Sequence, residues 1–351
     1  MITRQKTKVV HIGGVPVGGG NPLVIQSMTN TDTRNIPATI AQIKALEAAG
    51  CEIVRVAVPD IEAAEAIQRI KKEISIPLVA DIHFDYQLAL LAVKYGADKL
   101  RINPGNIGSE NHVRQVAEAA NANDLPIRVG VNGGSLEKDI LAKYNGVTPE
   151  GLAESALQNV SLLEKHNFKN IVVSVKASNI TLMLEAHKIL TKHLSYPLHI
   201  GLTEAGTPYK GSIRSATGLG ALLSLGIGDT LRVSLAGDPV QEILVAKDIL
   251  SAMGLRHFGV TVIACPTCGR TDLDVAEIAL QVEMKLAHIT TPLTVAVMGC
   301  AVNGPGEARE ADIGIAGGKN GAVLFRKGKV IRHIATNEII DTILDEVHSI
   351  Q

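Results

Sequence analysis

The stretch Leu78-Val79-Ala80-Asp81-Ile82-His83, followed by a helical pattern and then by Lys99-Leu100-Arg101-Ile102-Asn103, predicts the architecture of the larger part of this chain. Each run is short enough for one strand and ends in polar residues; the first is largely apolar, and the second alternates Lys99 and Arg101 with apolar residues. The two runs begin about 20 residues apart, which suits a repeat of strand, loop and helix. Most strand runs along the chain are continuously apolar and alternate with helical patterns, so they should belong to a parallel sheet that is buried on both faces.

The same rhythm occurs eight times before about residue 255. Eight such units predict a closed (β/α)8 TIM barrel. A doubly wound sheet would carry a glycine-rich dinucleotide turn after its first strand, whereas Gly218-Leu219-Gly220 follows the seventh. The glycine-rich stretch Val9–Gly20 predicts a hairpin that plugs or covers the barrel. The eight runs are Leu23–Ser27, Ile53–Val58, Leu78–Ile82, Lys99–Ile102, Ile127–Val131, Ile171–Val175, Leu198–Leu202 and Thr230–Ser234.

The pattern changes after about residue 255. Val260–Ala264 and Leu293–Met298 indicate strands that end at cysteines, and Asp272–His288 indicates a helix between them. Short strands and a final helix from about Asn337 follow. We therefore expect two domains: a substrate-binding TIM barrel over 1–255 and a smaller α+β domain with the cysteines over 256–351.

The composition of the 351 residues excludes several classes of protein. The net charge of −1 and the 3% aromatic content, with no Trp, argue against a nucleic-acid partner. No run of about 18 apolar residues occurs, and Met1–Lys6 lacks the apolar segment of a signal peptide, so we expect no membrane contact. Four cysteines are too few for a disulfide scaffold, which favours a reducing compartment, the cytoplasm.

Three of the four cysteines suggest a redox metal site. Cys265 and Cys268 have the C-x-x-C spacing, and Cys300 follows the next strand. Thiolates select zinc, copper(I) or an iron–sulfur centre, and a zinc knuckle or a thioredoxin-like pair stays an alternative. A closed zinc site needs a fourth ligand, however, and Cys51 enters a strand of the other domain.

Three thiolates suit a four-iron four-sulfur cluster, because they leave one iron for an oxygen ligand or a substrate. The nearest oxygen donor is Glu307, in a loop that also holds Asn303. Glycines and a proline allow tight turns there, which would bring these side chains toward the cluster. An exposed loop acid remains the alternative for Glu307.

Charged residues gather where the barrel strands end, which is the catalytic face of this fold. Five like charges repel one another unless an anion lies among them, and guanidinium groups match phosphate geometry. We therefore expect a small, highly anionic ligand, a diphosphate. Five strands contribute one cation each: Arg55, Arg101, Arg128, Lys176 and Arg232.

Glu204 is the carboxylate that we single out at this face. It could exchange a proton with a substrate beside a carbon–oxygen bond, or it could only form salt bridges with the cations. His83 and His199 could also take part in this site. The alternative is that they are core histidines with satisfied hydrogen bonds.

Seven motifs relate the chain to a known family: Gln26–Thr31, Cys51–Val56, Ala80–Phe84, Arg101–Asn106, Val131–Leu136, Ala264–Arg270 and Met298–Asp312. Through them the chain resembles, over essentially its full length, the bacterial 4-hydroxy-3-methylbut-2-enyl diphosphate synthases, iron–sulfur enzymes of the non-mevalonate isoprenoid pathway. The resemblance implies reductive opening and dehydration of 2-C-methyl-D-erythritol 2,4-cyclodiphosphate, with two electrons from a ferredoxin or flavodoxin.

The resemblance also implies roles for individual residues. One four-iron four-sulfur cluster would be held by Cys265, Cys268, Cys300 and Glu307, with Glu307 on the iron that meets the substrate. Glu204 would be the catalytic acid. The substrate pocket would consist of Arg55, Arg101, Arg128, Lys176, Arg232 and Ser234, with Asn132, His199 and Asn303 as further contacts.

Connectivity predicts a homodimer with an active site shared between chains. The last barrel helix should end at the bottom of the barrel, and a joining segment of about four to six residues reaches at most about 20 Å. The mouth of the same barrel is farther away, so each cluster should lie over the partner's barrel, as the resemblance also implies.

Two readings from other classes stay open. One is a zinc-stabilised barrel hydrolase that acts on a phosphoester. The other is a non-catalytic electron-transfer module, against which the cationic mouth argues, because a carrier needs no substrate pocket.

Overall fold

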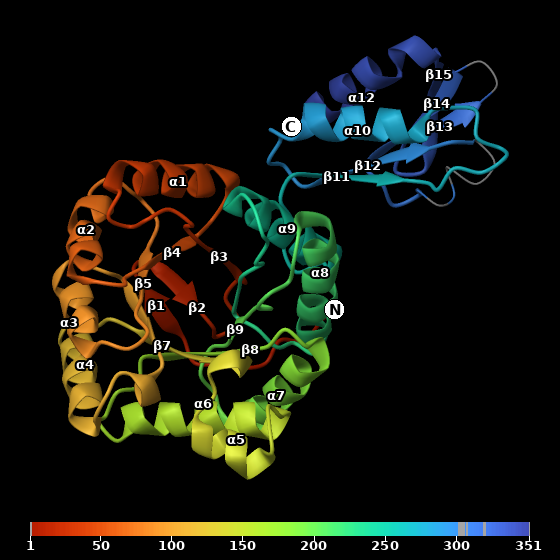
Figure 1. Cartoon of the computed structure of the whole chain (residues 1–351). Helices are drawn as coiled ribbons and strands as arrows, with labels where there is room; N and C mark the ends of the chain where they lie inside the picture. The colour runs from red at the N-terminus through yellow and green to blue at the C-terminus, as the bar shows by residue number, and fades with distance from the viewer. Residues whose placement is uncertain (1, 301–305, 307, 319–320, 351) are drawn as a thin grey trace. The chain divides into compact units, whose positions relative to one another are not determined.

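The structure is a computed structural model that describes residues 2–300, 306, 308–318 and 321–350. The chain divides into two compact units, Met1–Arg256 and His257–Gln351. In the first unit, strands run inside a ring of helices (Figure 1).

Eight parallel strands form the wall of the first unit, in the order β8-β7-β6-β5-β4-β3-β10-β9. A parallel bridge between Val173 and Leu198 joins the two ends of this order, so the sheet closes on itself. The predicted (β/α)8 barrel is confirmed. The strands are β3 (Val24–Met28), β4 (Ile53–Ala57), β5 (Leu78–Asp81), β6 (Lys99–Ile102), β7 (Ile127–Asn132), β8 (Ile171–Lys176), β9 (His199–Ile200) and β10 (Thr230–Leu231).

Helices cover the outside of the barrel (Figure 1). Several are preceded by a residue whose side chain accepts a hydrogen bond from a backbone N–H of the first turn. Asn35 accepts one from Ala38, and Asp238 accepts one from Val240. In the described part of the chain, no helix is long and apolar enough to cross a membrane. The helices are α1 (Ile36–Ala49), α2 (Ile61–Lys71), α3 (Tyr86–Lys94), α4 (Glu110–Ala122), α5 (Lys138–Tyr144), α6 (Pro149–Glu164), α7 (Ile180–His193), α8 (Pro208–Ser224) and α9 (Pro239–Ala252), with the short 3-10 helices Pro104–Asn106 and Gly133–Ser135.

The hairpin predicted within Val9–Gly20 closes one end of the barrel. Its strands β1 (Val10–Ile12) and β2 (Val15–Val17) pair in antiparallel fashion. Their apolar side chains pack against residues at the amino ends of four barrel strands, which are Val24, Ile53, Val79 and Val172. These contacts form an apolar floor, so the hairpin is a plug and not a flap.

The second unit is the predicted α+β module. Its sheet has the order β11-β12-β13-β14-β15, with β11, β12 and β13 parallel and the last two strands antiparallel. Helices α10 and α12 contribute Val282 and Ile343 to an apolar core with the sheet, while a smaller core includes Met298 and Phe325. The elements are β11 (Val260–Ala264), α10 (Val275–Leu286), β12 (Leu293–Met298), β13 (Ile313–Gly318), β14 (Gly321–Arg326), β15 (Lys329–Ile334), the 3-10 helix Thr336–Glu338 and α12 (Ile339–His348).

Candidate active site

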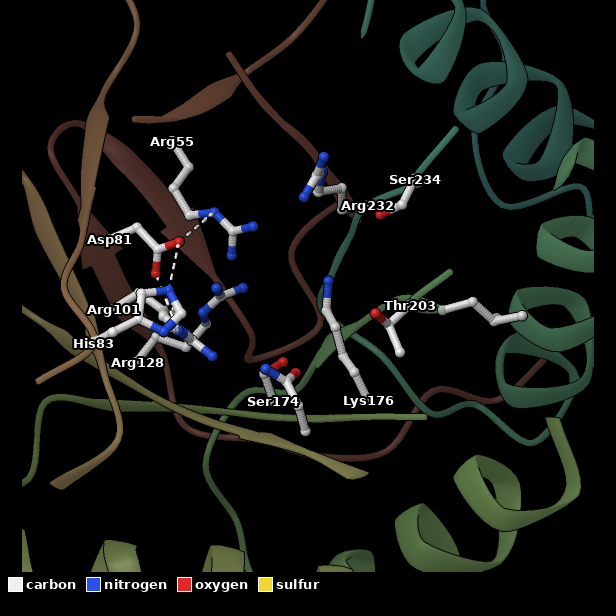
Figure 2. Close-up of a pocket in the computed structure, with 12 residues that line it drawn as sticks. Arg55, Asp81, His83, Arg101, Arg128, Ser174, Lys176, Thr203, Arg232 and Ser234 are labelled. Carbon is white, nitrogen blue, oxygen red and sulfur yellow. Dashed lines mark hydrogen bonds and ion pairs between the residues drawn. The ribbon is translucent and has the colours of Figure 1, made fainter. Parts of the chain in front are cut away.

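Cations from five barrel strands line one cavity of about 130 Å³ at the carboxyl end of the barrel (Figure 2). Among the described lining residues, Asp81 is the one carboxylate. This cationic cavity therefore suits a small ligand with several negative charges. The cations are Arg55, Arg101, Arg128, Lys176 and Arg232, and the other lining residues are His83, Asn132, Ser174, Leu202, Thr203 and Ser234.

Strand geometry and two glycines bring these groups together. Residues two apart on a strand face the same side, so Ser174 and Lys176 of β8 both reach the cavity. A Cβ on Gly130 would lie 2.5 Å from Nε of Arg101, and a Cβ on Gly201 would lie 3.0 Å from Nζ of Lys176. Glycine at both positions thus leaves room for the long cationic side chains.

Asp81 holds two arginines and a histidine at one side of the cavity (Figure 2). Its carboxylate accepts a hydrogen bond from Nη1 of Arg101 at 3.2 Å and lies 3.7 Å from Nε of Arg55. Nε2 of His83 lies 3.5 Å from the same carboxylate. Burial alone would raise the pKa of Asp81, but Arg55, His83 and Arg101 outweigh burial and hold this pKa well below its usual range. Asp81 is therefore a fixed anion at neutral pH.

Several basic side chains in the barrel lack a hydrogen-bond partner among the described residues. Nε and Nη1 of Arg128 are unpaired at 1% exposure, and Nζ of Lys99 is unpaired at 0% exposure. Burial, and then the nearby guanidinium groups, lower the pKa of Lys99 and of Lys176 well below the ordinary value. Buried polar groups are nearly always paired, so these donors favour an anion or water as the missing partner.

Glu242 positions Arg232, and Met28 gives Arg55 a second contact. Glu242, in the first turn of α9, accepts hydrogen bonds from Nε and Nη2 of Arg232 at 3.3 Å each and from the hydroxyl of Ser27 at 2.8 Å. Nη2 of Arg55 lies 2.9 Å from Sδ of Met28. Sequence reasoning missed Glu242, although the first turn of a helix that follows a barrel strand lies at the catalytic face.

Of the other predicted substrate contacts, two line the cationic cavity and one lies behind it. Asn132 and Ser234 line the cationic cavity, and with its amide turned to satisfy both atoms Asn132 accepts from Nη2 of Arg101 at 3.1 Å. His199 is fully buried, and its Nδ1 lies 2.8 Å from the hydroxyl of Thr230. It is not among the described residues that line the cavity. Burial, and then nearby cations, lower its pKa, which keeps the ring neutral.

Glu204 lies beside the cationic cavity. It lines a second cavity of about 360 Å³, and Ser234 lines both. Its φ of +54° puts the backbone in the left-handed region, which costs a residue other than glycine about 1 kcal/mol or more. Nη1 of Arg214 donates to the carbonyl oxygen of Glu204 at 3.3 Å and so stabilises this turn. The carboxylate is thereby presented, exposed, at the rim of the barrel.

The cysteines of the second unit follow two neighbouring parallel strands, β11 and β12. The backbone N–H of Gly299 donates to Sγ of Cys265 at 3.1 Å. A backbone hydrogen bond and the side chain of Arg270 lower the pKa of Cys268 and so favour its thiolate. Thiolates that accept N–H hydrogen bonds are typical iron–sulfur ligands, so the donor set of Cys265, Cys268 and Cys300 fits such a cluster.

The structure does not gather these thiols into a complete metal site. Within the described ranges, no group of three His, Cys, Asp or Glu side chains lies close enough to hold a metal ion. Glu307 and Asn303, which were predicted near the cluster, lie outside the described residues. Cys51 is buried in the barrel, where its Sγ lies 3.2 Å from the carbonyl oxygen of Ile53 and burial raises its pKa to about 12.

Profiles of known protein families match both units. The GcpE TIM-barrel domain matches residues 7–247, and the GcpE protein C-terminal domain matches residues 261–349. The chain belongs to the GcpE family. This GcpE-family chain is 56% identical to a Caldanaerobacter subterraneus protein, over 98% of this chain and 97% of the relative, and 54% identical to a Clostridium acetobutylicum protein, over 98% and 99%. Both relatives are named 4-hydroxy-3-methylbut-2-en-1-yl diphosphate synthase (flavodoxin), which confirms the predicted family of oxidoreductases.

Solved structures share the barrel of the GcpE-family chain at low sequence identity. Dihydropteroate synthase from Stenotrophomonas maltophilia has a TM-score of 0.52 at 13% identity, over 70% of this chain and 98% of that one. Type I 3-dehydroquinate dehydratase from Clostridium difficile has a TM-score of 0.51 at 14% identity, over 71% and 97%. At such identities the likeness concerns the fold alone.

Proposed function

We propose that this protein is a cytoplasmic 4-hydroxy-3-methylbut-2-en-1-yl diphosphate synthase, which reductively opens and dehydrates 2-C-methyl-D-erythritol 2,4-cyclodiphosphate. The observation that carries the proposal is the convergence of five cations on one cavity at the catalytic end of the barrel. The reaction takes up two electrons and two protons and releases one water. Flavodoxin, which appears in the names of the relatives, or a ferredoxin would supply the electrons.

The cationic cavity would bind the diphosphate of the substrate. Phosphate oxygens would accept hydrogen bonds from the unpaired N–H groups of Arg128. Their negative charge would also relieve the repulsion between Arg55, Arg101 and Arg232. The hydroxyl of Ser234 and the amide of Asn132 would orient the ligand. His199 would act from behind the lining residues, as a neutral support and not as a contact.

Glu204 would hold the proton that the departing oxygen requires. Ser234 lines both the cationic cavity and the cavity of Glu204, so a diphosphate in the first would leave the carbon skeleton near the second. Glu204 would therefore meet the substrate at its carbon–oxygen bonds, where a general acid is needed.

The second unit would carry one four-iron four-sulfur cluster held by Cys265, Cys268, Cys300 and Glu307. When bound, the cluster supplies low-potential electrons one at a time. The N–H group that reaches Sγ of Cys265 and the residues that favour a Cys268 thiolate support this assignment. Asn303, in the same loop as Glu307, would contact the substrate from the cluster side.

The protein would act as a homodimer in which the cluster of one chain serves the barrel of the other. Arg256 donates to the carbonyl oxygen of Leu23 and to the carboxylate of Glu52, which precede β3 and β4, so the first unit ends beside the apolar floor. The nine residues from there to Cys265 span at most about 31 Å. The outside of the barrel measures about 25 Å along α8, with 17 residues, so most of this span would be used before the chain could turn inward to the mouth of the same barrel.

The proposal can be tested with protein that is purified without oxygen. We expect a brown protein with four irons per chain that converts the cyclodiphosphate when reduced flavodoxin is supplied and not when flavodoxin is oxidised. A colourless zinc protein that hydrolyses a phosphoester without any reductant would instead establish the barrel hydrolase. Reduction of an acceptor without binding of the cyclodiphosphate would establish the electron-transfer module.

A further inference from the structure

An apolar cavity of about 320 Å³ lies next to the cationic cavity and has no role in the proposed reaction. Its walls come from the last residue of β4 and the segment that follows it, and from the segment that leads from β5 into the first turn of α3. It is termed the tail cavity here. The apolar wall residues are Ala57, Val58, Pro59, Phe84 and Leu88.

The tail cavity and the cationic cavity are neighbours on the same pair of strands. Asp81 and His83 line both cavities. On β4, Arg55 lines the cationic cavity, and Ala57, two residues later and on the same side of the strand, lines the tail cavity. Ala57 is in register with Asp81 of β5. The tail cavity therefore begins one side-chain level closer to the rim than Arg55.

The chemistry of the tail cavity suits a hydrocarbon. Its carboxylates are already engaged, because Asp81 is paired with arginines and Asp85 accepts the backbone N–H of Gln87 at 2.8 Å. The side chain of Phe84 is 73% exposed, so a ligand could bury much of this ring. Burial of an apolar group would thus be favourable and would leave no buried polar group without a partner.

We propose that the tail cavity binds the hydrocarbon chain of a diphosphate ester whose head group occupies the cationic cavity. The inference rests on the proposed function for the head group and adds a ligand class, namely diphosphate esters with chains longer than the five carbons of the product. Such an ester uses the same cations as the substrate and excludes it. The enzyme would therefore be inhibited by diphosphate esters with longer hydrocarbon chains.

Calorimetry on the cluster-loaded full chain can test this inference, with inorganic diphosphate, isopentyl diphosphate and geranyl diphosphate as probes. We expect the affinity to rise along this series, with geranyl diphosphate binding at least about tenfold more tightly than inorganic diphosphate. In turnover assays, geranyl diphosphate should raise the KM for the cyclodiphosphate and leave kcat unchanged.

Two variants locate the chain of the ligand. Ala57→Leu should fill the tail cavity, and Phe84→Ala should remove one of its walls. Both should reduce the tenfold gain to about twofold and leave the affinity for inorganic diphosphate unchanged. Leu225→Ala, which truncates an exposed apolar residue directly after α8, is the matched control and should keep the full gain.

Two outcomes overturn the inference and leave the proposed function intact. One is normal binding of inorganic diphosphate with no gain from a hydrocarbon chain, as expected if the partner subunit fills the tail cavity. The other is a gain that Ala57→Leu and Phe84→Ala do not reduce. Failure of inorganic diphosphate to bind at all would contradict both the inference and the anion site on which the proposed function depends.

Discussion

Lys99 is a buried basic residue between the apolar floor and the cationic cavity. It is in register with Val79 of the floor, and Arg101, two residues later on the same side of β6, lines the cavity. Its Nζ has no partner among the described residues, and burial lowers its pKa well below the ordinary value. A lysine in this setting lowers the stability of the empty barrel.

Lys99→Met should stabilise the protein by about 1 to 3 kcal/mol at neutral pH, because an unpaired buried amine is replaced by an apolar side chain of similar length. At pH values between the lowered pKa of the folded wild type and the ordinary pKa of the unfolded chain, the unfolded chain binds a proton at this lysine that the folded chain does not. Stability should therefore rise with pH between the lowered pKa and the ordinary pKa, and the variant should lose this part of the slope. Urea unfolding at a series of pH values measures both effects.

Lys169→Met, at an exposed position, is the control for this prediction and should change neither the stability nor its slope with pH. A Lys99→Met variant that is less stable than the wild type would show that Nζ has a favourable partner in the folded protein. Bound water is the obvious candidate for such a partner.

Single substitutions in the site should affect either the affinity for substrate or the rate of turnover, but not both. Arg55→Ala should weaken cyclodiphosphate binding by roughly 2 to 4 kcal/mol, because it removes a buried charge and leaves Asp81 with one fewer partner. Glu204→Gln should bind the substrate nearly as well as the wild type and turn it over far more slowly. Substrate titration and single-turnover rates distinguish the two effects.

Glu204→Gly is the matched variant for the second half of this prediction. Glycine accepts a φ of +54° without strain, so this variant should be at least as stable as the wild type while remaining inactive. Wild-type turnover by Glu204→Gln would mean that the carboxylate serves only in salt bridges.

At the scale of strands, the positions of the cysteines make a separate prediction. Cys265 and Cys300 follow neighbouring strands, so Cys265→Ser, Cys268→Ser or Cys300→Ser should each abolish iron binding and activity. Cys51→Ser should keep the cluster and most of the activity, because Cys51 is a buried thiol in the barrel. Iron content of the four purified variants measures the difference. A colourless Cys51→Ser protein that is folded by circular dichroism would contradict the ligand assignment.

Strand periodicity explains which parts of the site the sequence could predict. Lys176 ends β8 and Arg232 follows β10, so their convergence at the mouth followed from the eight-fold repeat. Arg128, which was predicted at the end of its strand, is instead the second residue of β7 and reaches the cavity from within the barrel. Strand periodicity could not identify Glu242, because it lies on α9 and its role depends on how this helix packs against Arg232. Gly130 of β7 leaves space for the side chain of Arg101 of β6. This contact joins two neighbouring strands, so no single stretch of sequence predicts it.

At the scale of the whole molecule, the assembly can be tested by complementation. Glu204→Gln chains and Cys300→Ser chains should each be inactive, and mixing them should restore one intact site per heterodimer if the cluster of one chain serves the barrel of the other. Activity after subunit exchange should approach half of the wild-type value for each heterodimer. Absence of recovery, with exchange demonstrated by differently tagged chains, would mean that each cluster serves its own barrel.

The apolar floor of the barrel leaves the site open at one end only. Val10, Ile12 and Val17 of the hairpin pack against the lower ends of the strands, so this end of the barrel is closed by hydrocarbon. Everything that reaches the cationic cavity must come and go through the mouth, past His83 and Glu204. The next substrate can therefore enter only after the product has left through the same opening. The rate of product release thus sets an upper limit on turnover, however fast the chemical step is.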